Sequence, residues 1–382
     1  MLLNKTRLDS LLARSGLAAI IVAKPENAIY ISGFHPMGSR SIRDRLSYVV
    51  YFSDPDASPV AIVPSADLRH TRELSWIPSE NIVGYTEFKT DNDSGLITDK
   101  YKYIAQVLHE RGLESGTIGV EQGFLPVDVL DRIRAVAPSA SFKDCTGLLK
   151  SARAVKMAEE IRRLRRAEEA TEKGCRRMIE LAAAGHTEIR VASEGRATSL
   201  LDGAETIGFT MVGGGTRSAF VHNNPRDERI RPGEVFRFDF GAIYDGYWGD
   251  LARTFVFGRK PTAEQQKVYD TILKTQETAL AALRPGATAD EVYRKAVEAG
   301  RTIDPSLRRE HVGHGVGLEV HEEPLLRAGN EMVIEPGMVI CVEAGKYVPD
   351  LGGFQVEDTV IITETGVEVL SSMPKQLFQP GV

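Results

Sequence analysis

The sequence predicts two domains, an α/β domain in residues 1–153 followed by an α+β domain in residues 154–382. Three observations support this fold class. The chain has 382 residues, more than one domain usually needs. Helix and strand patterns alternate up to about residue 150. A long charged helix then begins, and the strands after it are interrupted by glycines and interleaved with helices.

The first half begins with a helix pattern at residues 7–15. Apolar runs that indicate strands follow, at residues 18–24, 28–34, 47–52, 59–64 and 117–121. Two further helices are expected at residues 101–111 and 127–137. This alternation is typical of an α/β domain.

The second half opens with a helix expected over residues 157–184, whose apolar residues recur at helical spacing up to Gly185. Two later helices are expected to begin with capping boxes, in which a threonine and the side chain three residues on bond each other's backbone N–H. The pairs are Thr262 with Gln265 and Thr288 with Glu291.

The composition is that of an ordinary globular protein, with 42% hydrophobic and 26% charged residues. A net charge of -6, spread along the chain, argues against a nucleic-acid partner. The N-terminus lacks an apolar signal core and no long apolar run occurs, so we expect a cytoplasmic protein without a membrane segment. Cys145, Cys175 and Cys341 have no paired spacing and are interpreted as reduced packing residues.

A hairpin with two aspartates is the first chemical signal. Asp245-Gly246 lies between two apolar strands, which predicts a two-residue turn that pairs Tyr244 with Tyr247. Extending that register sets Asp239 opposite Ala252 and places Asp239 and Asp250 on one face, about 7–8 Å apart. The phenylalanines of the first strand, Phe236, Phe238 and Phe240, then occupy the other face.

Two carboxylates aimed at one point repel each other, so something must neutralise them. A proton, a metal cation, or the neighbouring Arg237 or Arg253 could do so, and the hairpin alone leaves these alternatives open.

Histidines and glutamates farther along favour the metal. His311, His314 and His321 cluster in a glycine-rich stretch, and His222 precedes the hairpin. Two further apolar strands each carry one central glutamate, Glu343 and Glu357. Four carboxylates with one or two histidines suit two Mn²⁺, Co²⁺, Zn²⁺ or Fe²⁺ ions, of which we expect Mn²⁺. Such a pair of ions activates a water between them, so hydrolysis is the expected chemistry.

The order of these residues resembles the pita-bread metallohydrolases, a family that includes prolidase, aminopeptidase P, methionine aminopeptidase and the metal-free creatinase. The motifs that carry the resemblance are "DFGAIYDGYWGDLARTF", "GHGVGLEVHE", "VEAGKY" and "VEDTV". The first domain, up to "RAVKMAEEIRRLRRA", resembles that of the creatinase and prolidase branch. The resemblance implies a creatinase-like α/β domain and a pita-bread catalytic domain.

The resemblance also implies a role for each matching position. The metal ligands are Asp239, Asp250, His314, Glu343 and Glu357. Glu343 acts as general base on the water between the ions, His321 supports the tetrahedral intermediate, and His222 contacts the substrate. Further substrate contacts are expected from His311, Tyr347 and Gln355. Because all five ligands are present, the metal-free mode of creatinase is not expected.

Three positions depart from the family pattern. Gln355 stands where proline-directed peptidases commonly have arginine, Glu310 where histidine is frequent, and Ala344 where proline is usual. The first change removes a positive charge and the second adds a negative one. They leave the substrate open between members of this fold.

The leading hypothesis is a metal-dependent hydrolase of a C–N bond in a small peptide or amide, with an Xaa-Pro dipeptide as the named substrate. The alternative is a hydrolase or lyase of a small non-peptide solute, resembling ectoine hydrolase or creatinase. A third hypothesis is a binding protein without catalysis. The resemblance also implies a homodimer, in which Arg40, Arg43 or Arg45 could reach a neighbouring pocket.

Overall fold

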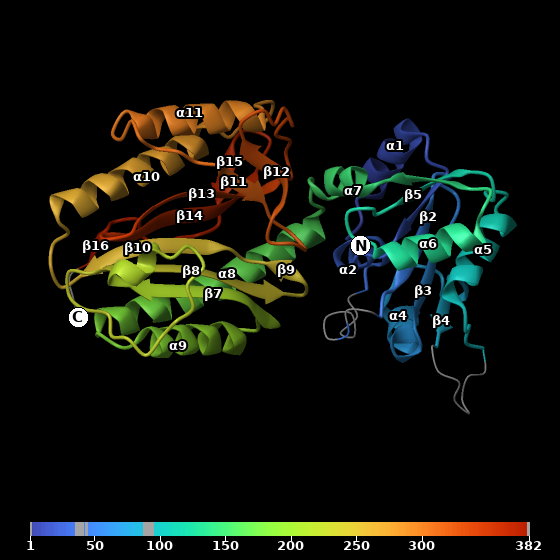
Figure 1. Cartoon of the computed structure of the whole chain (residues 1–382), viewed down its shortest axis with the longest axis horizontal. Helices are drawn as coiled ribbons and strands as arrows, with labels where there is room; N and C mark the ends of the chain where they lie inside the picture. Colours follow the sequence, from blue (N-terminus) through green and yellow to red (C-terminus); the bar gives the residue numbers. More distant parts are fainter. Residues whose placement is uncertain (1, 35–41, 43–44, 87–94, 380–382) are drawn as a thin grey trace. The chain divides into compact units, whose positions relative to one another are not determined.

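The computed structural model describes residues 2–34, 42, 45–86 and 95–379. The chain separates into two compact units, Met1–Arg153 and Ala154–Val382, which are described separately below (Figure 1).

Unit 1 is an α/β unit around one mixed sheet. Its strands lie in the order β4-β3-β2-β1-β5-β6. They are β1 (Ala19–Val22), β2 (Tyr48–Phe52), β3 (Val60–Pro64), β4 (Ile82–Tyr85), β5 (Thr117–Val120) and β6 (Ser141–Asp144). The helices are α1 (Lys5–Ser15), α2 (Pro25–Ser32), α4 (Leu68–Leu74), α5 (Lys100–Glu110), α6 (Val127–Val136) and α7 (Thr146–Arg153). β2 pairs antiparallel with β1 and β3, and the remaining neighbours are parallel.

One predicted strand of unit 1 is wrong. The apolar run at residues 28–34 lies mostly in the helix α2, not in a strand. Pro25 occupies the first turn of α2, where its fixed φ favours a helix start, and Glu26 in the same turn suits the helix dipole. Because α2 is buried from Asn27 to Ser32, its sequence has no polar face and resembles a buried strand.

Unit 2 contains two five-stranded sheets, each covered by a pair of helices (Figure 1). The first sheet has the order β16-β10-β8-β7, and β9 pairs with β8. Its strands are β7 (Thr206–Gly214), β8 (Val235–Tyr244), β9 (Tyr247–Trp248), β10 (Leu251–Phe257) and β16 (Phe378–Gln379). Helices α8 (Ala158–Ala183) and α9 (Glu188–Leu201) pack on it.

The second sheet has the order β12-β11-β13-β14-β15. Its strands are β11 (His311–Gly315), β12 (Glu322–Arg327), β13 (Val339–Val348), β14 (Gly352–Ile362) and β15 (Val367–Val369). Helices α10 (Ala263–Ala282) and α11 (Ala289–Arg301) cover it. The two sheets meet where β10 contacts β14, and the Thr254 hydroxyl bonds both the N–H and the carbonyl of Gln355 there.

The helix pairs leave one face of each sheet free for polar side chains. Phe236, Phe238 and Phe240 of β8 are fully buried against residues of α8 and α9, as the alternation of the strand predicts. On the second sheet, Ile340 and Val342 of β13 pack with residues of α10 and α11. The opposite faces are therefore available for the carboxylates.

Both predicted helix starts are confirmed, but only one of the two predicted capping boxes is complete. Thr262 and Gln265 form the full capping box of α10. At α11, Thr288 accepts from the N–H of Glu291, but the Glu291 carboxylate pairs with Arg284 and Lys295 instead of closing the box. These two cations offer the carboxylate charged partners in place of one backbone N–H.

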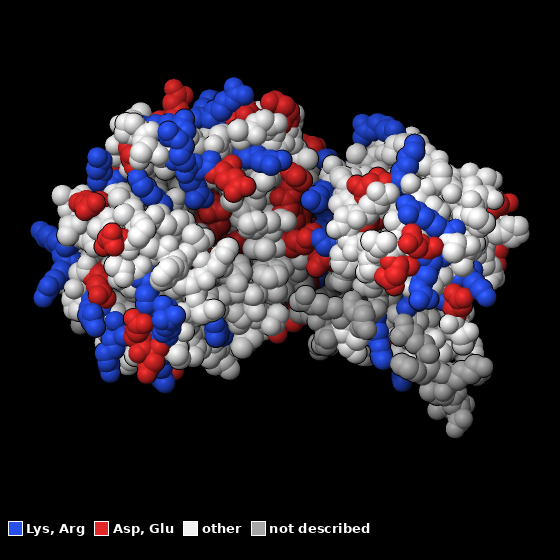
Figure 2. Space-filling view, in the orientation of Figure 1, with Lys and Arg blue, Asp and Glu red and all other residues white. Residues whose placement is uncertain are grey.

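Charged side chains of both signs are interspersed over the visible face of each unit (Figure 2). Within the described residues, no helix combines the length and the apolar character that crossing a bilayer requires.

Candidate active site

A cavity of about 470 Å³ in unit 2 collects the predicted site residues. Its charged and histidine lining comprises Asp239, Asp250, Glu310, Glu343, Glu357, Arg309, His222, His311, His314 and His321. Phe209, Met211, Val221, Val320, Tyr347 and Gln355 complete the lining. The cavity is therefore strongly acidic, with histidines along its wall.

The first sheet supplies the two aspartates through the predicted hairpin. Tyr244 pairs with Tyr247, and Asp239 lies opposite Ala252, which is the register expected from the sequence. Asp245 and Gly246 both have positive φ, at 47° and 84°, as a two-residue turn of this hairpin requires.

The second sheet supplies the histidine and the two glutamates. Glu343 of β13 lies directly opposite Glu357 of β14. His314 of β11 lies opposite Cys341 of β13, two residues before Glu343. Because side chains two residues apart on a strand share a face, all four of these groups point to the same side of the sheet.

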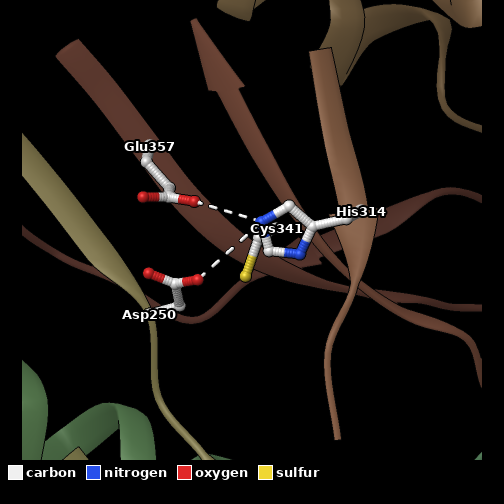
Figure 3. Close-up of side chains that lie close together, drawn as sticks. All are labelled: Asp250, His314, Cys341 and Glu357. Atoms are coloured by element: carbon white, nitrogen blue, oxygen red, sulfur yellow. Dashed lines mark ion pairs between the residues drawn. The ribbon is translucent and has the colours of Figure 1, made fainter. Parts of the chain in front are cut away.

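His314 points toward the carboxylates of Asp250 and Glu357, and dashed lines mark these two contacts in Figure 3. Its Nε2 is 3.8 Å from an oxygen of Asp250, 3.8 Å from one of Glu357 and 3.9 Å from one of Glu343. These separations exceed hydrogen-bond length. Its Nδ1 lies 3.1 Å from the carbonyl of Gly315, which fixes the ring with Nε2 directed to the carboxylates, as metal-ligating histidines are commonly held.

The pKa values reflect the burial and crowding of these carboxylates. Burial and mutual repulsion raise the pKa values of Asp250 and Glu357 well above the ordinary carboxyl value. Burial raises the pKa of Asp239 to about 6, although Arg237 opposes this. Burial lowers the pKa of His314 to about 4, so its imidazole is neutral and can act as a ligand at neutral pH.

Glu343 behaves differently from the other carboxylates. Burial opposes its ionisation, but Arg309 and the three nearby histidines outweigh burial and lower its pKa. Glu343 is therefore the carboxylate of the cluster that is most readily ionised.

The neighbouring arginines do not neutralise the aspartates through direct bonds. The Arg237 guanidinium donates to the carbonyls of Ser218, Phe220 and Val221 and to Gln355. Arg253 pairs with Asp358 at 2.5 Å, and Asp358 directly follows Glu357 on β14, so its side chain lies on the opposite face of that strand. A proton or a metal cation therefore remains to neutralise the carboxylates, and the raised pKa values of Asp250 and Glu357 show that they hold protons when no cation is bound.

The residues present fit divalent metal ions. Asp250, His314, Cys341 and Glu357 each place a ligand atom within 4.8 Å of the others. Oxygen and imidazole donors of this kind suit first-row divalent ions. Two such ions would also use Asp239 and Glu343, which line the same cavity.

Cys341 is the member of this cluster for which the sequence predicts only a packing role. It is buried and its Sγ lies 3.2 Å from the Thr359 hydroxyl. Its position two residues before Glu343 on a strand was the available signal, because that spacing puts both side chains on one face.

The predicted catalytic and substrate-binding residues also reach the cavity. The His321 ring lies against that of His314, with centroids 3.9 Å apart. His311 is 3.5 Å from Glu343, and its Nδ1 is buried without a hydrogen-bond partner among the described residues. His222 and Tyr347 line the wall. Of the three loop arginines, Arg40 and Arg43 lie outside the described residues, and Arg45 is exposed.

Gln355 has its main contacts within the protein. Its amide N–H donates to Asp239 at 3.0 Å, and its amide oxygen accepts from Arg237 at 2.8 Å and from Tyr347 at 3.3 Å. The residue is 3% exposed. It therefore positions Asp239, and because it also lines the cavity, its substrate contact stays a prediction.

Comparisons with known proteins agree with this geometry. Residues 162–364 match the model of Metallopeptidase family M24, and residues 5–155 match that of the Creatinase/Prolidase N-terminal domain. The chain belongs to metallopeptidase family M24. The M24 match covers more than half of the chain, and it includes every predicted metal ligand.

Named relatives are similar to nearly the whole length of the chain. The chain is 31% identical to the Xaa-Pro dipeptidase of Pyrococcus furiosus, over 98% of this chain and all of that protein. The structure resembles prolidase from Pyrococcus furiosus, with a TM-score of 0.80 at 30% identity, covering 96% of this chain and all of that one. It also resembles the Xaa-Pro dipeptidase from Bacillus anthracis, with a TM-score of 0.83 at 25% identity and 98% coverage of both chains.

Membership of M24 confirms the predicted family, the two-part fold and the metal-dependent hydrolysis of small peptides. The M24 family uses divalent metal ions, and the described cluster is suited to them.

Proposed function

We propose that this M24 metallopeptidase is an Xaa-Pro dipeptidase that uses two divalent metal ions, with Mn²⁺ as the expected metal. The observation that carries the proposal is the convergence of four carboxylates and one neutral imidazole, from both sheets, in a cavity of about 470 Å³. A cavity of this size suits a small substrate. The relatives named Xaa-Pro dipeptidase support the choice of peptide.

The ions would be held by Asp239, Asp250, His314, Glu343 and Glu357. When bound, they lower the pKa of a water and polarise the scissile carbonyl. Among the four carboxylate ligands, Glu343 is the one whose pKa is lowered.

Glu343 is proposed as the general base. Its lowered pKa keeps it ionised at neutral pH, so it can accept a proton from the attacking water. His321, whose ring lies beside that of His314, can donate a hydrogen bond to the oxyanion as it develops. His222 and His311, on the cavity wall, are in place to contact the bound peptide.

The test is hydrolysis of an Xaa-Pro panel by purified protein loaded with Mn²⁺ or Co²⁺. We expect turnover of Xaa-Pro dipeptides, loss of turnover with chelator, and a decrease of at least about 100-fold in kcat for Glu343→Gln, which removes the base. Xaa-Ala dipeptides, which lack the proline, serve as controls for specificity toward proline. No turnover of any dipeptide by fully loaded protein would refute the proposal.

A second candidate is hydrolysis of a non-peptide amide or elimination from a small solute. Gln355 favours it, because the position that commonly holds arginine in proline-directed relatives carries a neutral amide engaged with Asp239. The same loaded protein should be assayed against cyclic amidines and sulfonium osmolytes. Turnover of one of these without turnover of any dipeptide would select this candidate.

We further propose that the two compact units are domains and that the protein is a homodimer. Each unit has its own core, in residues Ala19–Ala137 for the first unit and Ala154–Leu377 for the second. Light scattering of the purified chain tests the dimer.

A further inference from the structure

The cavity contains one permanent positive charge that the proposed mechanism does not use. Among the described residues that line the cavity, Arg309 is the only arginine or lysine. Five carboxylates share the cavity with it. A guanidinium stays charged at every physiological pH, so it can attract an anionic group into an otherwise acidic pocket.

Arg309 is held in place by the strands on either side of it. Its Nε donates to the carbonyl of His311 at 3.2 Å, and its Nη1 to the carbonyl of Gly345 at 3.1 Å. Its Nη2 donates to Glu343 at 3.3 Å. These bonds use three of the five N–H groups of a guanidinium, which leaves one on each terminal nitrogen for a ligand.

The charge of Arg309 is only partly balanced by Glu343. That carboxylate also faces His311 and His314, at 3.5 and 3.9 Å, and it is one of the proposed metal ligands. When it binds a cation, its charge is shared with that cation, and the guanidinium is left to pair with another anion.

The position of Arg309 suits one group of a dipeptide. One residue spans about 3.3–3.6 Å of extended chain, so the C-terminal carboxylate of a dipeptide lies within roughly that distance of the scissile bond. Arg309 lies 3.3 Å from Glu343, the proposed general base, so the guanidinium is next to the group that would activate the attacking water. In a longer peptide the terminal carboxylate would be carried beyond its reach.

We propose that Arg309 is the carboxylate receptor of the pocket and that it restricts the enzyme to dipeptides by binding their C-terminal carboxylate. The proposal rests on the proposed dipeptidase function. It assigns to Arg309 a specificity role that none of the sequence motifs indicated.

The alternative is that Arg309 only positions Glu343. The two roles predict different responses to the substrate's terminal charge. A receptor affects only substrates with a free carboxylate, whereas a positioning residue affects every substrate equally.

The experiment compares Ala-Pro with Ala-Pro-amide for the wild-type protein, Arg309→Met and Arg309→Lys. Arg308→Met is the matched control, because Arg308 is exposed and bonds only the nearby carbonyls of Pro305 and Leu307 among the described residues. Metal content and thermal unfolding are measured for each variant, so that loss of ions or of folding is recognised.

We expect wild-type kcat/KM to favour Ala-Pro over its amide by about 100-fold, the range of a charge-assisted paired hydrogen bond. Arg309→Met should lose about 100-fold on Ala-Pro and little on the amide, so the preference disappears. Arg309→Lys should recover part of it, since lysine keeps the charge without the fork. Equal losses on both substrates would overturn the proposal.

A binding measurement separates failure of this proposal from failure of the dipeptidase function. Calorimetry of the Mn²⁺-loaded proteins with L-proline and L-prolinamide requires no turnover. The receptor predicts that proline binds more tightly to wild type and that Arg309→Met removes the difference. If wild type shows no such difference, the receptor is refuted even where dipeptides are cleaved.

Discussion

Gln355 joins a buried guanidinium to a carboxylate of the cavity. Because its oxygen accepts from Arg237 and Tyr347, its N–H group is forced to face Asp239. Arg237 also bonds the loop carbonyls of Phe220 and Val221, just before His222. The same amide thus connects a proposed ligand with the segment that carries a proposed substrate contact.

Replacing Gln355 should weaken metal binding more than folding. In Gln355→Leu, Asp239 loses its N–H donor and Arg237 loses one acceptor. Loss of such an outer partner typically lowers metal affinity by 10–100-fold. Calorimetric titration with Mn²⁺ should show this loss for one of two ions. Gln266→Leu is the control, because the amide of Gln266 bonds Asp270 within α10, and equal affinities in both variants would contradict the prediction.

The buried carboxylates also predict how the stability of the metal-free protein depends on pH. Burial raises the pKa values of Asp250 and Glu357, so both keep a proton when folded at a pH where the unfolded chain has lost it. Stability from such groups is present at low pH and is lost as the pH rises through the folded pKa. His314 and His321 have lowered pKa values and act in the opposite sense, but only below about pH 6.5.

We therefore expect the free energy of unfolding of the metal-free protein to fall from pH 6.5 to 8.5. The slope should be on the order of 1 kcal/mol per pH unit for each such proton. Bound Mn²⁺ keeps Asp250 and Glu357 ionised, so it should remove their contribution to the change of unfolding free energy with pH. Burial raises the pKa of Glu168 to about 8, and Glu168 should contribute to this pH dependence both with and without Mn²⁺. Urea unfolding with and without Mn²⁺ measures this, and identical slopes would count against it.

At the scale of single residues, alternation along strands was enough to predict Asp239, Asp250, Glu343 and Glu357. The same alternation also places Cys341 on the face of β13 that carries Glu343, because the two residues are two positions apart. The roles of Arg309 and Gln355 could not be predicted, because they depend on contacts with residues far away in the sequence, on β8 and β13.

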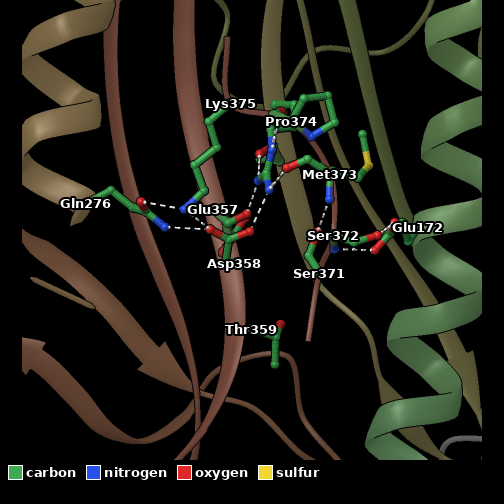
Figure 4. Close-up of polar contacts among 12 residues, drawn as sticks. Glu172, Gln276, Glu357, Asp358, Thr359, Ser371, Ser372, Met373, Pro374 and Lys375 are labelled. Carbon is green, nitrogen blue, oxygen red and sulfur yellow. Dashed lines mark hydrogen bonds and ion pairs between the residues drawn. The ribbon is translucent and has the colours of Figure 1, made fainter. Parts of the chain in front are cut away.

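At the scale of elements, the contact between β10 and β14 depends on one buried ionic group. Asp358 is fully buried and accepts from Arg253 at 2.5 Å, Gln276 at 2.8 Å and Lys375 at 2.5 Å (Figure 4). It follows Glu357 directly, so its side chain points to the other face of β14. The Asp358 carboxylate therefore connects β14 to β10 of the first sheet, to α10 and to the C-terminal segment.

Removing this charge should be costly. Asp358→Asn leaves the fully buried Arg253 and the partly exposed Lys375 without their carboxylate, and breaking a buried pair typically lowers the free energy of unfolding by about 3–5 kcal/mol. The comparison variant is Glu368→Gln, which breaks the exposed pair with Arg165 and should cost less than about 1 kcal/mol. Urea unfolding of both variants tests this, and similar midpoints would show that the buried pair contributes little.

The elements themselves were largely predictable. The Asp245-Gly246 turn set the register of β8 and β10, and helical spacing identified α8. The helix α2 could not be identified, because burial on all sides removes the polar face on which periodicity depends.

At the scale of the whole molecule, the proposed ligands all belong to the unit that spans residues 154–382. We expect chelator to lower the unfolding temperature of this unit only, because bound ions stabilise just the unit that holds them. Differential scanning calorimetry with Mn²⁺ and with chelator measures it, and the separately produced segment of residues 154–382 identifies its transition. A chelator shift in the transition of residues 1–153 would contradict this.

The ligand set is divided between the two sheets, with both aspartates on the first and the histidine and both glutamates on the second. An ion bound to both sets cross-links the two sheets of unit 2. The nearest ligands on the two sheets, Asp250 and His314, are more than sixty residues apart in the sequence. The site can therefore become catalytically competent only when the two sheets pack against each other. A nascent chain cannot complete the site until its last ligand strand has been synthesised and has paired.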